Sequence, residues 1–200
     1  MVAPIPVVQR PGLPAQPTEK SGFKLAGEEQ MSVDELTDEQ LDTFEANYRR
    51  VKKTEGGKYS LSEILLEKLR RKPTAFGTRE VAAKILELAR GSDDGLCTYG
   101  QIWSEFRPNE PWEGHKTLSI VASSLGRVVH YCVTNNLPIL TTLVVQTGTR
   151  QLSEKAIQNI YKDCRELGVN VGPDPDAFVR KQVDLARALA ISDLPIPATN

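Results

Sequence analysis

The chain has 200 residues, with 25 Lys and Arg against 26 Asp and Glu and a formal net charge of −1, which excludes a uniformly basic protein. Hydrophobic residues make up 40% of it, enough to build a core, so a wholly disordered protein is also excluded. No segment approaches the ~20 apolar residues that cross a bilayer, and the N-terminus lacks a secretory signal pattern. The three cysteines are odd in number and far apart, which predicts reduced thiols. We therefore expect a cytoplasmic protein with no membrane association.

The near-neutral total hides an uneven distribution of charge. Residues 1–48 hold 3 basic and 9 acidic residues, a net of −6, whereas residues 49–90 hold 12 and 5, a net of +7. Such asymmetry can mark a surface for nucleic acid, with the acidic segment competing for it. It can equally reflect two solvated helices of opposite charge that pack on each other. The sequence leaves both interpretations open.

The N-terminal third predicts a tail followed by a helical hairpin. Residues 1–36 are rich in Pro, Gly, Glu and Gln and are predicted to be a disordered acidic tail. Capping boxes at Thr37 and Ser60 begin two amphipathic helices, which a Gly-Gly pair separates and Pro73 ends. Residues 37–75 are therefore predicted to form an antiparallel hairpin with a basic loop and a basic exit.

The middle of the chain predicts a winged-helix-like core over residues 76–150. A helix from Thr78 to about Arg90 is followed by a short helix that a capping box at Thr98 begins, and then by a long helix over about residues 116–135. The β-branched segment 139–145 predicts a strand. Helix, short helix, long helix and strand follow one another in the order of a winged helix, in which the long helix is the recognition element.

The C-terminal part predicts two further amphipathic helices within residues 151–190, which would brace the core or pair two protomers into a homodimer. Residues 191–200 contain two prolines and are predicted to be a second tail. The expected fold is thus mainly α with a small β element: a disordered N-terminal tail, a helical hairpin, a winged-helix-like core and two C-terminal helices.

The motif Leu-Cys-Thr-Tyr-Gly-Gln-Ile at residues 96–102, with the helix before it, resembles the DNA-binding domain of alkylguanine-DNA alkyltransferases and alkyltransferase-like proteins. The resemblance covers about residues 78–145. In that family a short helix that opens with Thr-Tyr-Gly packs under a recognition helix, and a Pro-Cys-His-Arg or Pro-Trp-His-Arg motif follows. Here Ile139 follows Pro138 without a His-Arg pair, and Ser119 falls near the position of the Arg that props open the duplex. The resemblance implies the architecture and a DNA-facing helix, but not alkyl transfer.

The candidate DNA contacts come from two segments. Hydroxyls and a guanidinium on the solvent face of the long helix can reach phosphates and base edges. These predicted groove-facing residues are Ser119, Ser123, Ser124 and Arg127. The basic hairpin would supply salt-sensitive phosphate contacts. Its candidates are Lys52, Lys53, Lys58, Arg70, Arg71 and Lys72.

No catalytic, metal or cofactor constellation stands out in the sequence. His130 and Cys132 are two residues apart on a helix and so point to different sides. Trp112 lies in a Pro-containing loop, where capping the core is favoured over contacting a ligand. The leading hypothesis is a non-enzymatic protein that binds duplex DNA. The alternative is an adaptor or inhibitor that binds an acidic protein partner through the basic hairpin.

Overall fold

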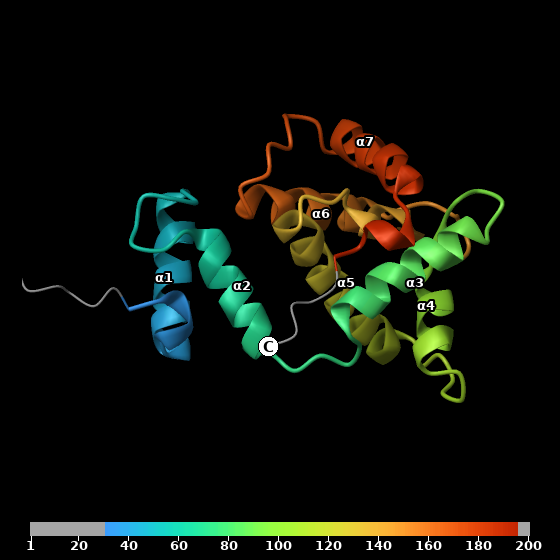
Figure 1. The fold of residues 1–200 in the computed structure, drawn as a ribbon, viewed down its shortest axis with the longest axis horizontal. Helices are drawn as coiled ribbons and strands as arrows, with labels where there is room; N and C mark the ends of the chain where they lie inside the picture. Colours follow the sequence, from blue (N-terminus) through green and yellow to red (C-terminus); the bar gives the residue numbers. More distant parts are fainter. Residues whose placement is uncertain (1–30, 196–200) are drawn as a thin grey trace, which may run out of the picture. The chain divides into compact units, whose positions relative to one another are not determined.

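A computed structural model describes residues 31–195, and within this range it contains seven α-helices, three 3-10 helices and two short strands (Figure 1). The prediction of a mainly helical fold with a small β element is therefore confirmed. Most of the predicted N-terminal tail and the end of the predicted C-terminal tail lie outside the described residues. Residues 32–195 belong to one compact unit.

The predicted hairpin consists of α1 (Asp38–Val51) and α2 (Leu61–Arg71), which pack side by side (Figure 1). Both predicted capping boxes are present. The Thr37 hydroxyl accepts a hydrogen bond from the Gln40 amide at 3.2 Å, and the Gln40 side chain accepts one from the Thr37 amide at 2.8 Å. Ser60 makes the same reciprocal pair with the third residue of α2. Each box satisfies amide groups that the first helical turn leaves free.

The hairpin has a small apolar cluster of its own. The buried members come from both helices and from the segments beside them: Leu36, Leu41, Tyr48, Tyr59, Leu61 and Ile64. Leu36 is only 3% exposed, and it follows the 3-10 helix η1 (Val33–Glu35). The predicted tail boundary at residue 36 is therefore wrong by a few residues, because Leu36 has a hydrophobic partner in the hairpin.

The main core begins with α3 (Thr78–Arg90), followed by β1 (Cys97–Thr98) and α4 (Tyr99–Phe106). The long helix α5 (His115–Thr134) packs against both α3 and α4. The Thr98 capping box is again present, with the Thr98 hydroxyl accepting from the third amide of α4. The three helices agree with the sequence prediction to within about one residue, whereas β1 was not predicted.

The predicted strand at 139–145 is mostly a 3-10 helix. Leu140–Leu143 forms η2, and only Val144–Val145 forms a strand, β2. The Thr142 amide and hydroxyl both donate to the Ile139 carbonyl, at 3.1 and 2.7 Å, which closes the turn. All of these residues are buried, so their β-branched composition reflects burial from every side rather than a pleated strand.

The small sheet is parallel, with Cys97 opposite Val144 and Thr98 opposite Val145. A wing would be an antiparallel hairpin, and none occurs within residues 31–195. The β element instead joins the start of α4 to the end of η2.

The last helices, α6 (Glu154–Glu166) and α7 (Pro175–Ala188), share the main core instead of forming a separate layer. The 3-10 helix η3 (Ile191–Asp193) is followed by Leu194, which is 2% exposed. The Arg79 side chain donates to the carbonyls of Leu194 and Pro195. The predicted C-terminal tail therefore begins too early, because these residues are tied to α3.

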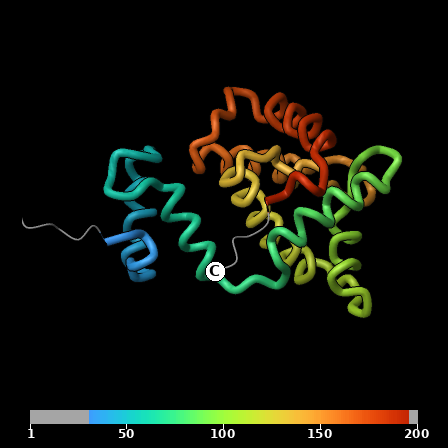
Figure 2. Tube along the Cα trace, in the orientation of Figure 1, coloured from blue at the N-terminus to red at the C-terminus, as the bar shows by residue number. Residues whose placement is uncertain are grey.

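An extended linker carries the chain from α2 to α3 (Figure 2). Arg127 of α5 donates to the carbonyls of Lys72 and Pro73 in this linker. A second connection joins Arg49 of α1 to Glu166 of α6 at 2.6 Å. These contacts attach the hairpin to the main core.

Candidate nucleic-acid interface

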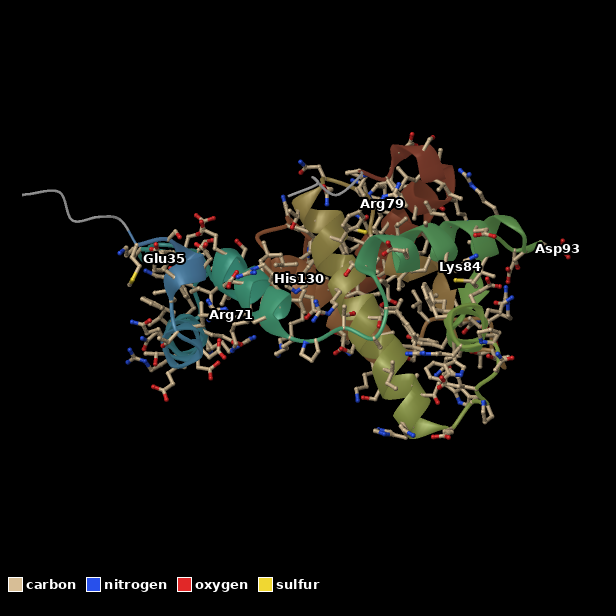
Figure 3. All side chains as sticks on the ribbon, turned by 60° about the horizontal axis from the view of Figure 1, so that its bottom comes forward. Glu35, Arg71, Arg79, Lys84, Asp93 and His130 are labelled. Atoms are coloured by element: carbon tan, nitrogen blue, oxygen red, sulfur yellow. The ribbon has the colours of Figure 1, made fainter. Side chains whose placement is uncertain are left out.

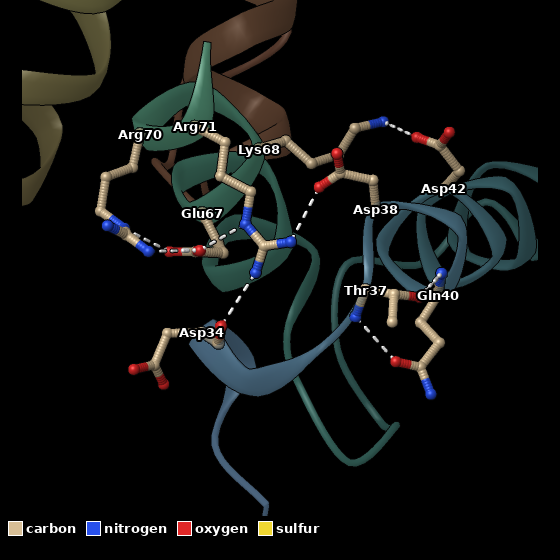
Figure 4. A network of polar contacts seen from close by, with 9 residues as sticks. All are labelled: Asp34, Thr37, Asp38, Gln40, Asp42, Glu67, Lys68, Arg70 and Arg71. Carbon is tan, nitrogen blue, oxygen red and sulfur yellow. Dashed lines mark hydrogen bonds and ion pairs between the residues drawn. The ribbon is translucent and has the colours of Figure 1, made fainter.

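The acidic and basic segments of the sequence pair with each other in the hairpin (Figure 4). Glu67 is 5% exposed and accepts hydrogen bonds from Arg70 and Arg71, each at 2.7 Å. Arg71 also reaches Asp38 at 2.8 Å. The guanidinium groups, Arg70 first, hold the pKa of Glu67 down to about 2. Arg70 and Arg71 thus serve the hairpin itself, as the packed-helix interpretation expects, and are not free for phosphate.

The other predicted hairpin cations are free of acidic partners within residues 31–195. Lys52, Lys53, Lys58 and Lys72 are all exposed. Lys58 lies 5.4 Å from the centre of the Tyr59 ring. Lys52 ends α1 in the left-handed conformation, with a φ of 54°, where glycine is the usual residue.

Two of these lysines border a cleft of about 900 Å³ between the α1–α2 loop and the end of α6. We call it the basic cleft, and its lining residues are Tyr48, Arg49, Lys52, Lys53, Thr54, Glu55, Leu61, Arg165 and Glu166. Arg49 is neutralised by Glu45 and Glu166. Lys52, Lys53 and Arg165 have no ion pair within the described residues, and Glu55 is the one unpaired carboxylate among the lining residues, so the cleft has an excess of positive charge.

The predicted groove-facing set on α5 is divided by the structure. Ser119 and Ser123 are exposed, as expected. Ser124 is buried and donates to the Ile120 carbonyl at 3.1 Å. Arg127 is 9% exposed and holds the α2–α3 linker. The prediction is therefore wrong for Ser124 and Arg127, because both side chains are buried and Arg127 is engaged by the linker backbone.

On the same helix, two residues of the apolar stripe that the sequence pattern assigns to the core, Leu118 and Ala122, are exposed. Leu118 is 40% exposed, and both Leu118 and Ala122 line a second cleft, of about 740 Å³. We call it the aromatic cleft, and its lining residues are Tyr99, Gly100, Trp112, His115, Leu118, Ser119, Ala122, Gln146, Thr147, Gly148, Thr149, Ser153, Lys155, Ala156 and Asn159.

Three ring side chains line the aromatic cleft: Tyr99 in the first turn of α4, Trp112 in the α4–α5 loop and His115 in the first turn of α5. Tyr99 also packs against the main core. Trp112 is 42% exposed, so the expectation that it caps the core is wrong. Trp103 is buried instead, and its indole N–H donates to the Glu110 carbonyl at 3.0 Å. The sequence signal for this was Trp103, nine residues earlier in an amphipathic helix, which could fill the core in place of Trp112.

The walls of the aromatic cleft are fixed by polar contacts. Arg150 donates to Asp94 at 2.9 Å and to the Leu96 carbonyl at 3.0 Å, which holds the loop after β2 against the turn before β1. The Arg150 guanidinium holds the pKa of the Asp94 carboxyl well below its usual range. The Tyr99 hydroxyl has no hydrogen-bond partner among residues 31–195, and burial raises its pKa, so it is a neutral donor at pH 7.

The cysteines do not form a reactive site. Cys97, Cys132 and Cys164 are buried and unpaired by disulfides. Burial raises the pKa of each thiol to about 12, so the nucleophilic thiolate is scarce at neutral pH. Within the part of the chain that the structure describes, no group of three or more His, Cys, Asp or Glu residues is placed to hold a metal ion. No helix there is long and apolar enough to span a membrane.

Comparison with known proteins found no matching family model, no matching curated protein and no matching solved structure.

Proposed function

We propose that the protein binds DNA without catalysing a reaction on it. The observation that carries the proposal is the aromatic cleft, where Tyr99, Trp112 and His115 present rings at an opening of about 740 Å³. Aromatic rings that line a groove hold nucleic-acid bases by stacking. The neighbouring hydroxyl of Ser119 and the ammonium group of Lys155 suit phosphate and base edges.

The order of the core elements supports the resemblance to alkyltransferase DNA-binding domains. Thr98, Tyr99 and Gly100 begin α4, which packs against α5. The departures noted in the sequence apply equally here. Ile139 is buried where that family carries its alkyl-accepting cysteine, so the proposal includes binding and excludes alkyl transfer.

Phosphate contacts would come from the exposed lysines of the hairpin. Of the six candidate cations that the sequence analysis names, Arg70 and Arg71 are engaged with Glu67. The four that remain for phosphate are Lys52, Lys53, Lys58 and Lys72. Each lysine that neutralises a phosphate releases counterions, so affinity for DNA falls as salt rises.

The test is a titration of the full chain with a fluorescent duplex and with one strand of it, at ~50 and ~200 mM salt. We expect binding that weakens with salt. Trp112→Ala removes an exposed ring, and we expect it to cost about 1–3 kcal/mol of binding. Leu185→Ala on α7, which is 45% exposed, is the matched control and leaves affinity unchanged.

Absence of binding at ~50 mM salt, or affinity that does not respond to salt, would refute the proposal. A Trp112→Ala protein that binds as tightly as the control would refute the assigned cleft. Both variants alter exposed side chains, so a thermal unfolding curve is expected to match that of the parent protein.

The basic cleft favours a second function, binding of an acidic protein partner. Its unpaired cations are Lys52, Lys53 and Arg165, and none of them belongs to α5. The exposed face of α5 has Lys116 as its cation, and Lys116 pairs with Glu113 at 2.8 Å. A partner that is recovered after nuclease treatment and lost in Lys52→Glu would support this function over DNA binding.

A further inference from the structure

The two clefts lie at the opposite ends of one helix. Ser153, Lys155 and Asn159, at the N-cap and in the first half of α6, line the aromatic cleft. Arg165 and Glu166, at the end of α6, line the basic cleft. A ligand that occupies both clefts would therefore have to follow α6.

The exposed face of α6 connects the clefts with polar and basic side chains. Residues three or four apart share one face of a helix, and four such exposed residues run along α6. They are Lys155, Gln158, Lys162 and Arg165. We call this face the α6 stripe. Two carboxylates lie beside the stripe: Glu154, exposed one turn before Gln158, and Glu166, which Arg49 holds through hydrogen bonds of 2.6 and 3.2 Å.

The side chains of the α6 stripe are not needed to hold the helix in place. α6 is anchored from its opposite side by buried residues that include Ile160, Cys164 and Leu167. Lys162 makes only a long contact with Glu166, at 3.8 Å, and Arg165 lies 5.8 Å from the Tyr161 ring centre. Two exposed cations with such weak internal contacts are available to a ligand.

We infer that the α6 stripe guides a single nucleic-acid strand from the aromatic cleft to the basic cleft. This inference rests on the proposed function and specifies its ligand. Rings at one end and exposed cations along the path are the two components of single-strand sites, which combine base stacking with a positive track for the backbone. A single strand offers a base to the rings without the cost of unstacking a duplex.

The length of α6 sets the length of the bound strand. The 13 residues of α6 span about 20 Å at ~1.5 Å per residue. A stacked strand advances ~3.4 Å per nucleotide, so about six nucleotides join the two clefts. An acidic peptide could follow the cations, but its side chains give the rings no stacking partner, so a nucleic-acid strand fits the path better.

The experiment measures binding of the full chain to fluorescein-labelled oligothymidylates of 3, 6, 8 and 12 nucleotides by anisotropy. We expect affinity to rise roughly tenfold between the 3-mer and the 8-mer and then to level off, because about six nucleotides fill the path. Lys162→Gln combined with Arg165→Gln removes the middle and the end of the stripe. Its salt slope is expected to fall by about 1.4, at ~0.7 per lost contact with a single strand.

The matched control is Arg180→Gln combined with Lys181→Gln, which removes two exposed cations of α7 that line neither cleft. We expect this control to keep the parent's salt slope and length dependence, whereas the α6 variant loses the gain from 3 to 8 nucleotides. Thermal unfolding of both variants checks that α6 is intact.

The measurements distinguish a failure of DNA binding from a failure of the strand path along α6. If no oligonucleotide or duplex binds the parent protein at ~50 mM salt, the proposed function fails and the strand path fails with it. If the parent binds but the α6 variant behaves as the α7 control does, only the path along α6 is overturned. Binding of a Glu-rich peptide that depends on Lys162 and Arg165, without any oligonucleotide binding, would assign the stripe to a protein partner.

Discussion

Lys52 occupies a backbone conformation that disfavours its own side chain. Its φ of 54° lies in the left-handed region, where a Cβ atom meets the following carbonyl and glycine is free of that strain. Most helices that end in this conformation carry glycine or asparagine there. A lysine at this position, exposed beside the basic cleft, is more easily explained by what it binds than by the stability of α1.

We therefore predict that Lys52→Gly makes the protein more stable and a weaker DNA binder. The gain is about 0.5–1 kcal/mol in the free energy of unfolding, from release of the left-handed strain. Urea denaturation measures the stability, and the salt-dependent titration measures the binding. Lys53→Gly is the control, because Lys53 carries the same charge without the positive φ. It is expected to weaken binding without stabilising the fold, and equal stabilities of the two variants would contradict the explanation.

The cations could be identified from the sequence, but which of them are free of acidic partners could not. Arg70 and Arg71 look as available as Lys52 in a linear count, yet Glu67 is buried between them (Figure 4). The reason is spatial: Asp38 is 33 residues from Arg71 and becomes its neighbour only when α1 packs on α2. Arg127 was misjudged in a similar way, since its partners are backbone carbonyls of a linker 54 and 55 residues away.

Helices were predictable because their start signals are local. The capping boxes at Thr37, Ser60 and Thr98 each lie within four consecutive residues, and all three form as expected. The segment 139–145 was not predictable, because its β-branched residues are buried on every side and their composition carries no period. The aromatic cleft was missed for a related reason: an apolar pattern cannot distinguish a core stripe from a cleft lining.

Two neighbouring threonines of the 3-10 helix η2 differ in whether their buried hydroxyl groups have a hydrogen-bond partner. The Thr141 hydroxyl is buried with no hydrogen-bond partner, whereas the Thr142 hydroxyl donates to the Ile139 carbonyl at 2.7 Å. We predict that Thr141→Val stabilises the protein by about 0.5–1.5 kcal/mol, because an unsatisfied buried polar atom is removed. Thr142→Val is expected to destabilise it by about 1 kcal/mol, because a satisfied hydrogen bond is lost.

The two variants make the same chemical change in neighbouring buried residues, so each is the control for the other. Midpoints of urea unfolding at equal slope measure both effects. The same sign of change in Thr141→Val and Thr142→Val would contradict the hydrogen-bond assignment in η2.

The junction between the hairpin and the main core contains a titratable side chain, His130. His130 of α5 (labelled in Figure 3) interacts electrostatically with Arg127 and Glu166, the two core residues that hold the linker and the hairpin, and its Nδ1 atom is buried without a partner. Burial, followed by the positive charge of Arg127, lowers the pKa of His130 below 6.5, and Glu166 opposes this shift. The folded protein therefore keeps His130 neutral at pH values where the unfolded chain takes up a proton.

The sign of the pH dependence follows from this difference. Above pH 6.5, His130 is neutral in both states and does not reduce the free energy of unfolding. As the pH falls from 6.5 towards the lower pKa of the folded state, the unfolded chain binds a proton that the folded protein does not, so the free energy of unfolding decreases. We predict that the parent protein loses stability between pH 7.5 and 5 by up to about 1.4 kcal/mol per pH unit below 6.5 from this group. His130→Gln removes that loss. His115→Gln, at an exposed position, retains it, and an unchanged pH profile in His130→Gln would rule out the assignment.

The separate apolar cluster of the hairpin has a consequence for how the molecule opens. α1 and α2 can lose their contact with the core by breaking a few polar links, such as Arg49–Glu166 and Arg127–Lys72, without exposing the main apolar cluster. We expect the free energy of such an opening to lie below that of global unfolding, so that the hairpin and the main core, although they form one compact unit, behave as two cooperative units. Because the basic cleft has walls on both units, an opened molecule would lose the cleft while both folded parts persist. A ligand seated there would bind only the closed form and would hold the two units together by mass action.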